Sequence, residues 1–377
     1  MTSQQGEVLQ LSDVKDYISQ VRDQTFGLLN LKINSQLEVV GLDIGSKYVK
    51  LLKINRAENP YRIEKFAIIP APVAIGSVSN DPAQDLTILA AAIKDMFTQA
   101  GISNTEVALA IPRSIAILKN ITIDSRLSPE DIESRAWIEA NHHFPDLIGE
   151  IYLDFFVSEP LAEDNTHMEL TLVACRKSQI QPYLDVLRLA GLQVKIVDVD
   201  CYALERALPL TINSTTNDEV LALLSLNTST SNLIVVQSNK LIYAHDQGYD
   251  GQRLISQTSA YLKSKSENAN ISPTELLQDE AYQEILKNNL ISHLHHIMHF
   301  FSTSRPHLSI QKLILAGDCA TVPCMVPFIK QEIGIETEAP NLLSHLVLAP
   351  EIDSAKFNEH SSRLVLCCGL ALSHLEY

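Results

Sequence analysis

The chain has 377 residues, of which 46% are hydrophobic and 20% are charged, and its formal net charge at pH 7 is −16. This length allows two or more domains. Proteins that bind nucleic-acid phosphates rely on Lys and Arg, so the acidic excess argues against a nucleic-acid partner and otherwise serves solubility. The sequence has no run of about 18 apolar residues and no basic, apolar signal peptide. We therefore expect a cytoplasmic protein that reaches a membrane only through partners.

Residues 1–37 predict an N-terminal extension with an amphipathic helix. Apolar side chains recur at helical spacing from Val14 to Val21, after a capping pair at Ser12-Asp13. This helix either packs on its own domain or docks onto a partner. Its polar face lacks the basic excess of membrane-surface helices, so a protein partner is preferred to lipid.

Residues 39–52, VVGLDIGSKYVKLL, predict two apolar strands joined by a tight turn. Gly45 allows the backbone to turn sharply and to approach a ligand closely. The N–H groups of Ser46 and Lys47 can then point at an anion, and Asp43 can hold Mg²⁺ through water. This is the pattern of a phosphate-binding hairpin, although the same turn also joins strands in proteins without a ligand.

The middle of the chain, residues 103–197, predicts an inserted α/β unit. A buried strand at 107–111 is followed by a helix at 130–143, whose apolar side carries Trp137. A strand at 171–175, a helix at 179–190 and a strand at 194–199 complete the unit.

The strand pattern of the N-terminal hairpin recurs in the second half of the chain. Strands are predicted at 221–227, 232–236 and 240–245, in the order of those at 39–44, 48–54 and 61–69. Each set is followed by a helix, at 85–100 and at 251–264. Two halves that share one order of elements indicate a duplicated α/β domain. Residues 262–270 predict a polar connection, and the segments 273–289 and 290–304 predict helices.

Histidines and cysteines do not form a metal-site pattern. His295 and His299 lie four apart on a predicted helix, but no HExxH pattern accompanies them, and a half-exposed helix face is expected. The six cysteines include no CxxC pair, which favours buried, reduced thiols. No nucleophile elbow supports Ser-His-Asp catalysis, so no catalytic residue is predicted.

Several segments together carry a family resemblance. They are the motif GLDIGS at 41–46, the segments 127–145 and 152–155, VACRK at 173–177, AGLQVKIVDVDCYALERAL at 190–208 and GLAL at 369–372. In these segments the chain resembles the PilM family, actin-like cytoplasmic proteins of type IV pilus assembly that are similar to FtsA. The resemblance extends from about residue 38 to the C-terminus.

The resemblance implies an α/β, actin-like ATPase fold with two duplicated subdomains and an inserted one. Residues 38–102, completed by about 198–208 and 340–377, would form the first subdomain, and 209–339 the second. The insertion at 103–197 would help to form a groove for the cytoplasmic N-terminal tail of the membrane protein PilN, bound partly by strand addition. The chain would then be a scaffold that links this tail to the assembly motor ATPases, and a dimer or filament is left open.

The resemblance also implies where ATP and Mg²⁺ would bind. Asp43, Gly45, Ser46 and Lys50 match the first phosphate motif of the family. In the second, Ser225-Leu226-Asn227 stands where the family has Asp-x-Gly, and a single glycine, Gly317, remains of the adenosine pair. Asp318 would place a negative charge beside an anionic ligand, or hold the ribose. The candidate nucleotide-binding residues are Asp43, Gly45, Ser46, Lys47, Lys50, Asn227, Thr228, Gly317 and Asp318.

These departures predict a scaffold in which ATP binding is weak or lost. One candidate metal carboxylate, Asp43, and no clear water-orienting residue argue against phosphoryl transfer. The alternatives are an active ATPase or sugar-kinase-like enzyme on the same fold, or the equivalent scaffold of a related pilus or type II secretion system.

Overall fold

A computed structural model describes residues 38–144, 149–157, 166–212, 219–266 and 272–373. The predicted N-terminal helix lies outside these residues. Contacts divide the chain into a smaller unit, which contains Ser114–Leu184, and a larger unit, which contains Ser35–Arg113 and Asp185–Tyr377. Among the described helices, none is both long enough and apolar enough to span a membrane.

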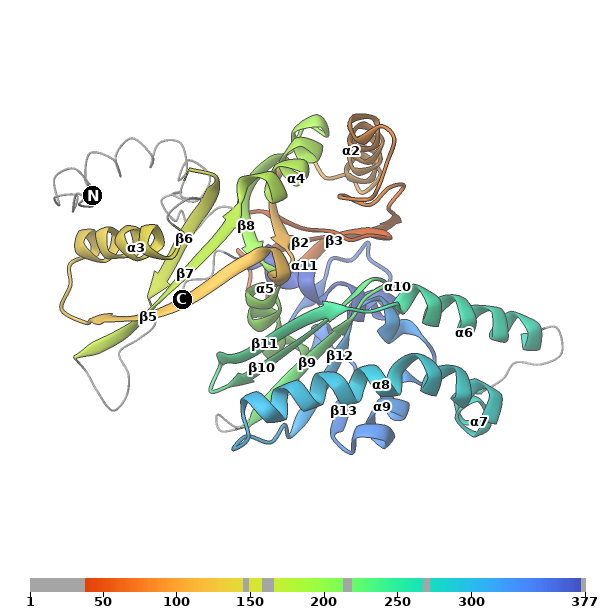
Figure 1. The fold of residues 1–377 in the computed structure, drawn as a ribbon. Coiled ribbons are helices and arrows are strands. Elements are labelled where there is room, and N and C mark those ends of the chain that lie inside the picture. The colour runs from red at the N-terminus through yellow and green to blue at the C-terminus, as the bar shows by residue number, and fades with distance from the viewer. Residues whose placement is uncertain (1–37, 145–148, 158–165, 213–218, 267–271, 374–377) are drawn as a thin grey trace. The chain divides into compact units, whose positions relative to one another are not determined.

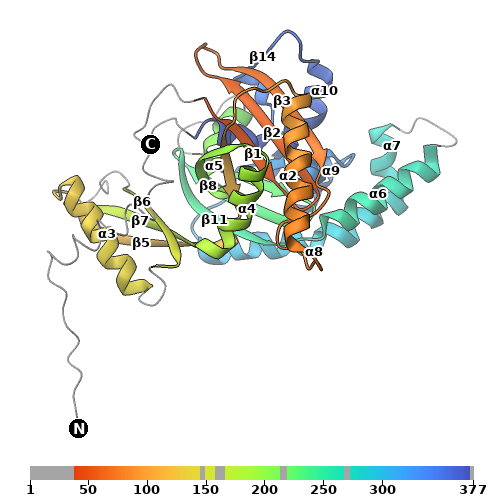
Figure 2. The ribbon, with the colours of Figure 1, turned by 90° about the horizontal axis from the view of Figure 1, so that it is seen from above.

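The first sheet of the larger unit has the strand order β14-β3-β2-β1-β4-β8. Its strands are β1 (Val40–Ile44), β2 (Tyr48–Asn55), β3 (Arg62–Pro70), β4 (Glu106–Ile111), β8 (Gln193–Val199) and β14 (Val347–Leu348). The strands β1, β2 and β3 form an antiparallel meander, and β4 is parallel to β1. Helix α2 (Pro82–Gln99) lies over one face of this sheet, and α11 (Val365–Ala371) packs against β1 and β2 from the other (Figures 1 and 2).

The second sheet repeats this arrangement in the order β11-β10-β9-β12-β13. Its strands are β9 (Val220–Leu226), β10 (Thr230–Gln237), β11 (Lys240–Gly248), β12 (Lys312–Ala316) and β13 (Glu336–Glu338). Again the first three strands form an antiparallel meander, and the fourth runs parallel to the first. The predicted duplication is confirmed, and the fold is actin-like α/β.

Helices cover the second sheet through one shared apolar core. They are α6 (Gly251–Ser266), α7 (Pro273–Gln278), α8 (Glu280–Ser304) and α9 (Met325–Ile333). Leu286, Leu290 and Leu294 of α8 are fully buried and pack with Leu224 and Leu315 of the sheet. Figure 1 shows α8 running along the sheet.

Two helix boundaries differ from the sequence prediction. The predicted break between residues 289 and 290 is wrong, because α8 continues through it and buries Leu290 in the core. The break lies at Asp279, whose side chain accepts hydrogen bonds from the N–H groups of Ala281 and Tyr282 and so begins α8. Helix α6 also continues to Ser266, into the predicted polar connection.

The chain crosses from the first sheet to the second through α5 (Asp200–Ala207) and the 3-10 helix η2 (Leu208–Thr211). Helix α5 packs on α11 at a glycine: a Cβ built on Gly369 would lie 1.8 Å from the carbonyl oxygen of Ala203. A Cβ on Gly41 would lie 2.1 Å from the carbonyl oxygen of Cys367. These two glycines therefore let α11 contact α5 and β1 directly.

The smaller unit is a three-stranded antiparallel sheet with a helix on one face. The strand order is β5-β7-β6, with β5 (Ala116–Asp124), β6 (Ile151–Val157) and β7 (His167–Arg176). Helix α3 (Pro129–His143) begins at Ser128, whose Oγ accepts a hydrogen bond from the N–H of Asp131. Its buried residues Ala136, Trp137 and Ala140 complete the core of this unit, as predicted.

The insertion is shorter than the predicted range 103–197. The predicted strands at both ends of that range exist, as β4 and β8, but they pair with the first sheet of the larger unit. Strand β4 pairs in parallel with β1, which buries its apolar run in that sheet, and β8 pairs in parallel with β4 at the edge of the sheet. Contacts within the insertion therefore cover Ser114–Leu184, which ends inside α4 (Lys177–Leu189).

Candidate functional site

The N-terminal hairpin has the predicted geometry. The N–H of Gly45 donates a hydrogen bond to the carbonyl oxygen of Tyr48 at 2.9 Å, which closes the turn between β1 and β2. In the antiparallel register Asp43 lies opposite Lys50. The two side chains therefore project from the same face of the sheet, and the Lys50 Nζ lies 3.2 Å from Oδ2 of Asp43.

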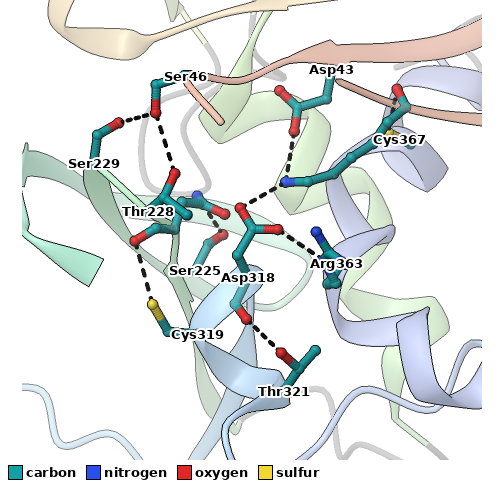
Figure 3. Close-up of polar contacts among 12 residues, drawn as sticks. Asp43, Ser46, Ser225, Thr228, Ser229, Asp318, Cys319, Thr321, Arg363 and Cys367 are labelled. Atoms are coloured by element: carbon teal, nitrogen blue, oxygen red, sulfur yellow. Dashed lines mark hydrogen bonds and ion pairs between the residues drawn. The ribbon is translucent and has the colours of Figure 1, made fainter. Parts of the chain in front are cut away.

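The turns of the two duplicated hairpins contact each other through hydroxyl groups (Figure 3). The Oγ of Ser46 lies 2.8 Å from Oγ of Ser229 and 3.2 Å from Oγ1 of Thr228. A phosphate bound by both turns needs its own oxygens between these hydroxyls, because each hydrogen bond spans about 2.8 Å. The two turns must therefore separate before they can hold a phosphate between them.

Asn227 occupies the position that has glycine in the family motif, and its side chain turns back to its own strand. Its Nδ2 donates to Oγ of Ser225 at 3.2 Å, and its backbone N–H donates to the carbonyl oxygen of Thr230 at 2.9 Å. The second bond is the counterpart of the Gly45–Tyr48 bond in the first hairpin. The backbone of the turn is thus preserved, while the side chains of Ser225 and Asn227 satisfy each other.

A buried ion-pair cluster lies beside the hairpins (Figure 3). Lys50, which is 3% exposed, places its Nζ 3.2 Å from Oδ2 of Asp318 as well as from Asp43. The Nε of Arg363 donates to Oδ1 of Asp318 at 2.9 Å, and its guanidinium lies 4.2 Å from the centre of the Tyr48 ring. Two cations thus balance two carboxylates, with Asp318 between both cations.

The electrostatics of Lys50 follow from these neighbours. Burial alone would lower the pKa of Lys50, but the charges of Asp43 and Asp318 outweigh it and raise the pKa above its ordinary value. Lys50 therefore stays charged, and its charge is already compensated within the protein.

Gly317 allows the backbone after β12 to pack directly against β9 of the second sheet. Its φ is +92°, and a Cβ there would lie 2.4 Å from the carbonyl oxygen of Leu226 in β9. Only glycine fits such an approach. Asp318 follows directly and begins the 3-10 helix η3 (Asp318–Thr321). The close contact of Gly317 with β9 therefore places Asp318 beside Lys50.

The structure brings most of the predicted site residues into two adjoining sets. Asp43, Lys50 and Asp318 share the ion-pair cluster, and Ser46 and Thr228 share the hydroxyl contact. The side chain of Lys47 is exposed. Sequence reasoning missed Ser229, Tyr48 and Arg363. The first two adjoin predicted motifs, whereas Arg363 lies far along the chain and carries no local signal.

The residues fit Mg²⁺ and ATP only in part. Asp43 is 17% exposed, but its Oδ2 contacts Lys50. Within the described ranges, no three His, Cys, Asp or Glu residues are grouped so that they could hold a metal ion. The cations that favour an anionic ligand, Lys50 and Arg363, both contact the carboxylate of Asp318. A phosphate would have to compete with that carboxylate for both of them.

Two predictions away from the cluster are confirmed in outline. His295 and His299 are exposed on α8. All six cysteines are free, and all are buried except Cys324, which is half-buried. Burial raises the pKa of Cys368 to about 12 and that of Cys175 to about 11, so these thiols stay protonated.

Comparison with known proteins identifies the family. The model of the family described as type IV pilus assembly protein PilM matches residues 41–375. The chain belongs to the PilM family. A solved chain from a PilM–PilN type IV pilus biogenesis complex is 21% identical, with a TM-score of 0.71. The match covers 91% of this chain and 100% of that chain, and it shows that the PilM fold extends over nearly the whole protein.

Weaker likenesses lie outside the PilM family. The ethanolamine utilization protein EutJ from Carboxydothermus hydrogenoformans is 13% identical, with a TM-score of 0.47, over 94% of this chain and 99% of that chain. MreB5 of Spiroplasma citri, solved bound to AMPPNP, is 11% identical, with a TM-score of 0.46, over 89% of this chain and 96% of that chain.

Proposed function

We propose that this chain is an actin-like scaffold of type IV pilus assembly. It binds the cytoplasmic N-terminal tail of a PilN-like membrane protein and links it to the assembly motor ATPases. It is held at the cytoplasmic face of the inner membrane by that partner. The observation that carries this proposal is the likeness of nearly the whole chain to a protein solved in a PilM–PilN complex.

The smaller unit offers strand edges that suit an extended tail. Both β5 and β6 have β7 as their one neighbouring strand among the described residues. An edge strand can accept a peptide by adding one more strand, and side chains on alternate positions then select its sequence. This supports the tail site in the insertion, now narrowed to Ser114–Leu184.

We further infer that the scaffold does not depend on ATP hydrolysis. The carboxylate of Asp318 contacts Lys50 and Arg363, and the turns of the duplicated hairpins bond directly through Ser46 and Ser229. Both contacts link the first sheet to the second. The protein thereby supplies its own counter-charges where a nucleotide would supply phosphates. The alternative, an active ATPase, has one candidate metal carboxylate in Asp43.

Fluorescence anisotropy tests the scaffold proposal. A labelled peptide with the sequence of the PilN-like tail should bind the full chain at micromolar concentration or below, and a scrambled peptide should not. A variant with residues 114–184 replaced by a short Gly-Ser linker should lose binding while circular dichroism shows that the larger unit remains folded. Binding that survives this replacement would refute the site in the insertion.

If the variant with the Gly-Ser linker does not fold, a second experiment on the full chain tests the same site. A tail peptide with a photoreactive group is cross-linked to the full chain, and the adducts are mapped by mass spectrometry. Adducts within residues 116–176 support the site, and adducts confined to the larger unit contradict it.

A further inference from the structure

Helix α5 is held to the second sheet by two carboxyl groups. It begins directly after β8 of the first sheet and contacts β10 and β11 of the second. Asp200, at its first position, accepts hydrogen bonds from Nδ2 of Asn232 at 2.5 Å and from the N–H of Arg113 at 3.1 Å. Glu205, on the same helix, accepts from the N–H of Leu241 at 2.6 Å. One carboxyl thus bonds to β10 and the other to β11.

Within the part of the chain that the structure describes, neither Asp200 nor Glu205 forms an ion pair with an arginine. Asp246 of β11 faces Asp200, and the Nη1 of Arg113 lies 3.7 Å from Oδ1 of Asp246. On the other side, Asp198 of β8 faces Glu205, and Arg206 pairs with Asp198 at 3.0 Å. Arg113 and Arg206 therefore pair with Asp246 and Asp198 rather than with the two carboxyls of α5. The negative charges of Asp246 and Asp198 disfavour ionisation of Asp200 and Glu205.

Burial is the main reason that the pKa of each carboxyl group is raised. It raises the pKa of Asp200 to about 7, helped by the charge of Asp246 and opposed by the bonds from Asn232, Cys201 and Arg113. Burial likewise raises the pKa of Glu205 to about 7, against the Leu241 N–H and the charge of Arg206. Both groups would return to ordinary carboxyl values in water.

A neighbouring side chain can accept a hydrogen bond from Asp200 when Asp200 is protonated. The Oδ1 of Asn232 is buried and has no hydrogen-bond partner among the described residues. The amide oxygen and nitrogen of Asn are related by a rotation of the side chain. After that rotation, a protonated Asp200 donates its O–H to Oδ1 of Asn232. The amide oxygen and the buried carboxyl then satisfy each other, and Nδ2 of Asn232 moves to the position in which Oδ1 has no partner.

We propose that α5 is a proton-dependent connector between the two halves of the actin-like unit. When Asp200 and Glu205 are protonated, α5 remains attached to β10 and β11. When they ionise, the attachment weakens, because separation lets water reach the charges. This inference does not depend on the pilus role of the chain.

The direction with pH follows from proton linkage. The attached state binds more protons than the separated state wherever the pH lies between the ordinary and the raised pKa, so attachment is strongest at low pH and is lost as the pH rises towards about 7. Each carboxyl contributes up to about tenfold in the separation equilibrium per pH unit in that window. Above the window the equilibrium levels off.

Hydrogen exchange of the full chain tests the connector. The protection of amides in α5 and β11 is compared between the wild type and the double variant Asp200→Asn, Glu205→Gln at each of several values from about pH 5 to about pH 8, so that the intrinsic pH dependence of exchange cancels. Both substitutions keep a side-chain acceptor but cannot ionise. The wild-type protection should fall relative to the double variant as the pH rises, by up to about a hundredfold for two carboxyls over one pH unit.

Controls make the outcome decisive. Glu284→Gln changes an exposed carboxyl on α8 and should retain the wild-type pH dependence. A double variant that keeps the wild-type pH dependence would overturn the proposal. If the double variant does not fold, the single variant Glu205→Gln is used. The logarithm of its amide protection should then change with pH about half as steeply as in the wild type. An unchanged slope in that variant overturns the proposal equally.

Discussion

The ammonium nitrogen of Lys50 lies 3.2 Å from Oδ2 of Asp318, and this ion pair joins the first sheet to the segment that follows β12. Lys50 is 3% exposed and the Asp318 side chain 5%. Burying two charges costs desolvation energy, which their attraction offsets only with good geometry. We expect this pair to favour the present arrangement of the two sheets, because without it Lys50 keeps only Asp43 and Asp318 keeps only Arg363 as the partners of the cluster.

Lys50→Met should lower the free energy of unfolding by about 3–5 kcal/mol, because it leaves the half-buried Asp43 and the buried Asp318 without their shared cation. Urea denaturation followed by circular dichroism measures this change. Lys47→Met is the matched control: the Lys47 side chain is exposed, so its loss should cost less than about 0.5 kcal/mol. In a double-mutant cycle with Asp318→Asn, a coupling energy near zero would contradict the structural role of the pair.

Mg-ATP should not stabilise the protein. A site with a dissociation constant a hundredfold below the ligand concentration would raise the free energy of unfolding by about 2.7 kcal/mol, which thermal unfolding and calorimetry would both detect. We expect neither a thermal shift nor binding heat at millimolar ligand. A clear shift that Asp43→Ala removes would instead support the ATPase alternative and a metal-binding role of Asp43.

Gly369→Ala should destabilise the larger unit. Alanine is normally the better helix former by about 1 kcal/mol. Here its Cβ would lie 1.8 Å from the Ala203 carbonyl oxygen, so α5 and α11 must move apart, at an expected cost of about 3 kcal/mol or more. Thermal unfolding measures the change. Gly248→Ala, where a Cβ meets nothing within 4 Å, should be nearly neutral, and equal effects of the two substitutions would contradict the packing argument.

Leu153→Ala should destabilise the smaller unit by about 2–5 kcal/mol, because Leu153 is 1% exposed within its core. Trp137 is the only tryptophan of the chain and belongs to the same core, so its fluorescence reports on this unit. The fluorescence transition in urea should move to lower denaturant. Ile117→Ala, at a side chain that is 41% exposed, should move it much less.

The repeated strand order was readable from the sequence because it depends on local pattern. An apolar strand, a polar turn and a second apolar strand follow one another in residues 39–54 and again in residues 221–236. Such a pattern predicts a hairpin without tertiary information. The insertion boundary was not readable. The strand β4 is a nearly continuous apolar run and β8 is a mixed one, and the sheet that each strand joins depends on contacts distant in the chain.

The sequence by itself determined the duplicated α/β architecture, the hairpin turn at Gly45 and the family. It also showed that the second hairpin lacks the acid and glycine of the first, at Ser225 and Asn227. Only the tertiary structure decided what the remaining charges do. Asp318 and Arg363 lie in separate segments. The contacts of Asp318 with Lys50 and with Arg363 arise because folding places η3 beside β2 and beside the 3-10 helix η5 (Ser361–Arg363). Ion pairs between distant segments leave no periodicity in a sequence, since only folding brings the charges within bonding distance.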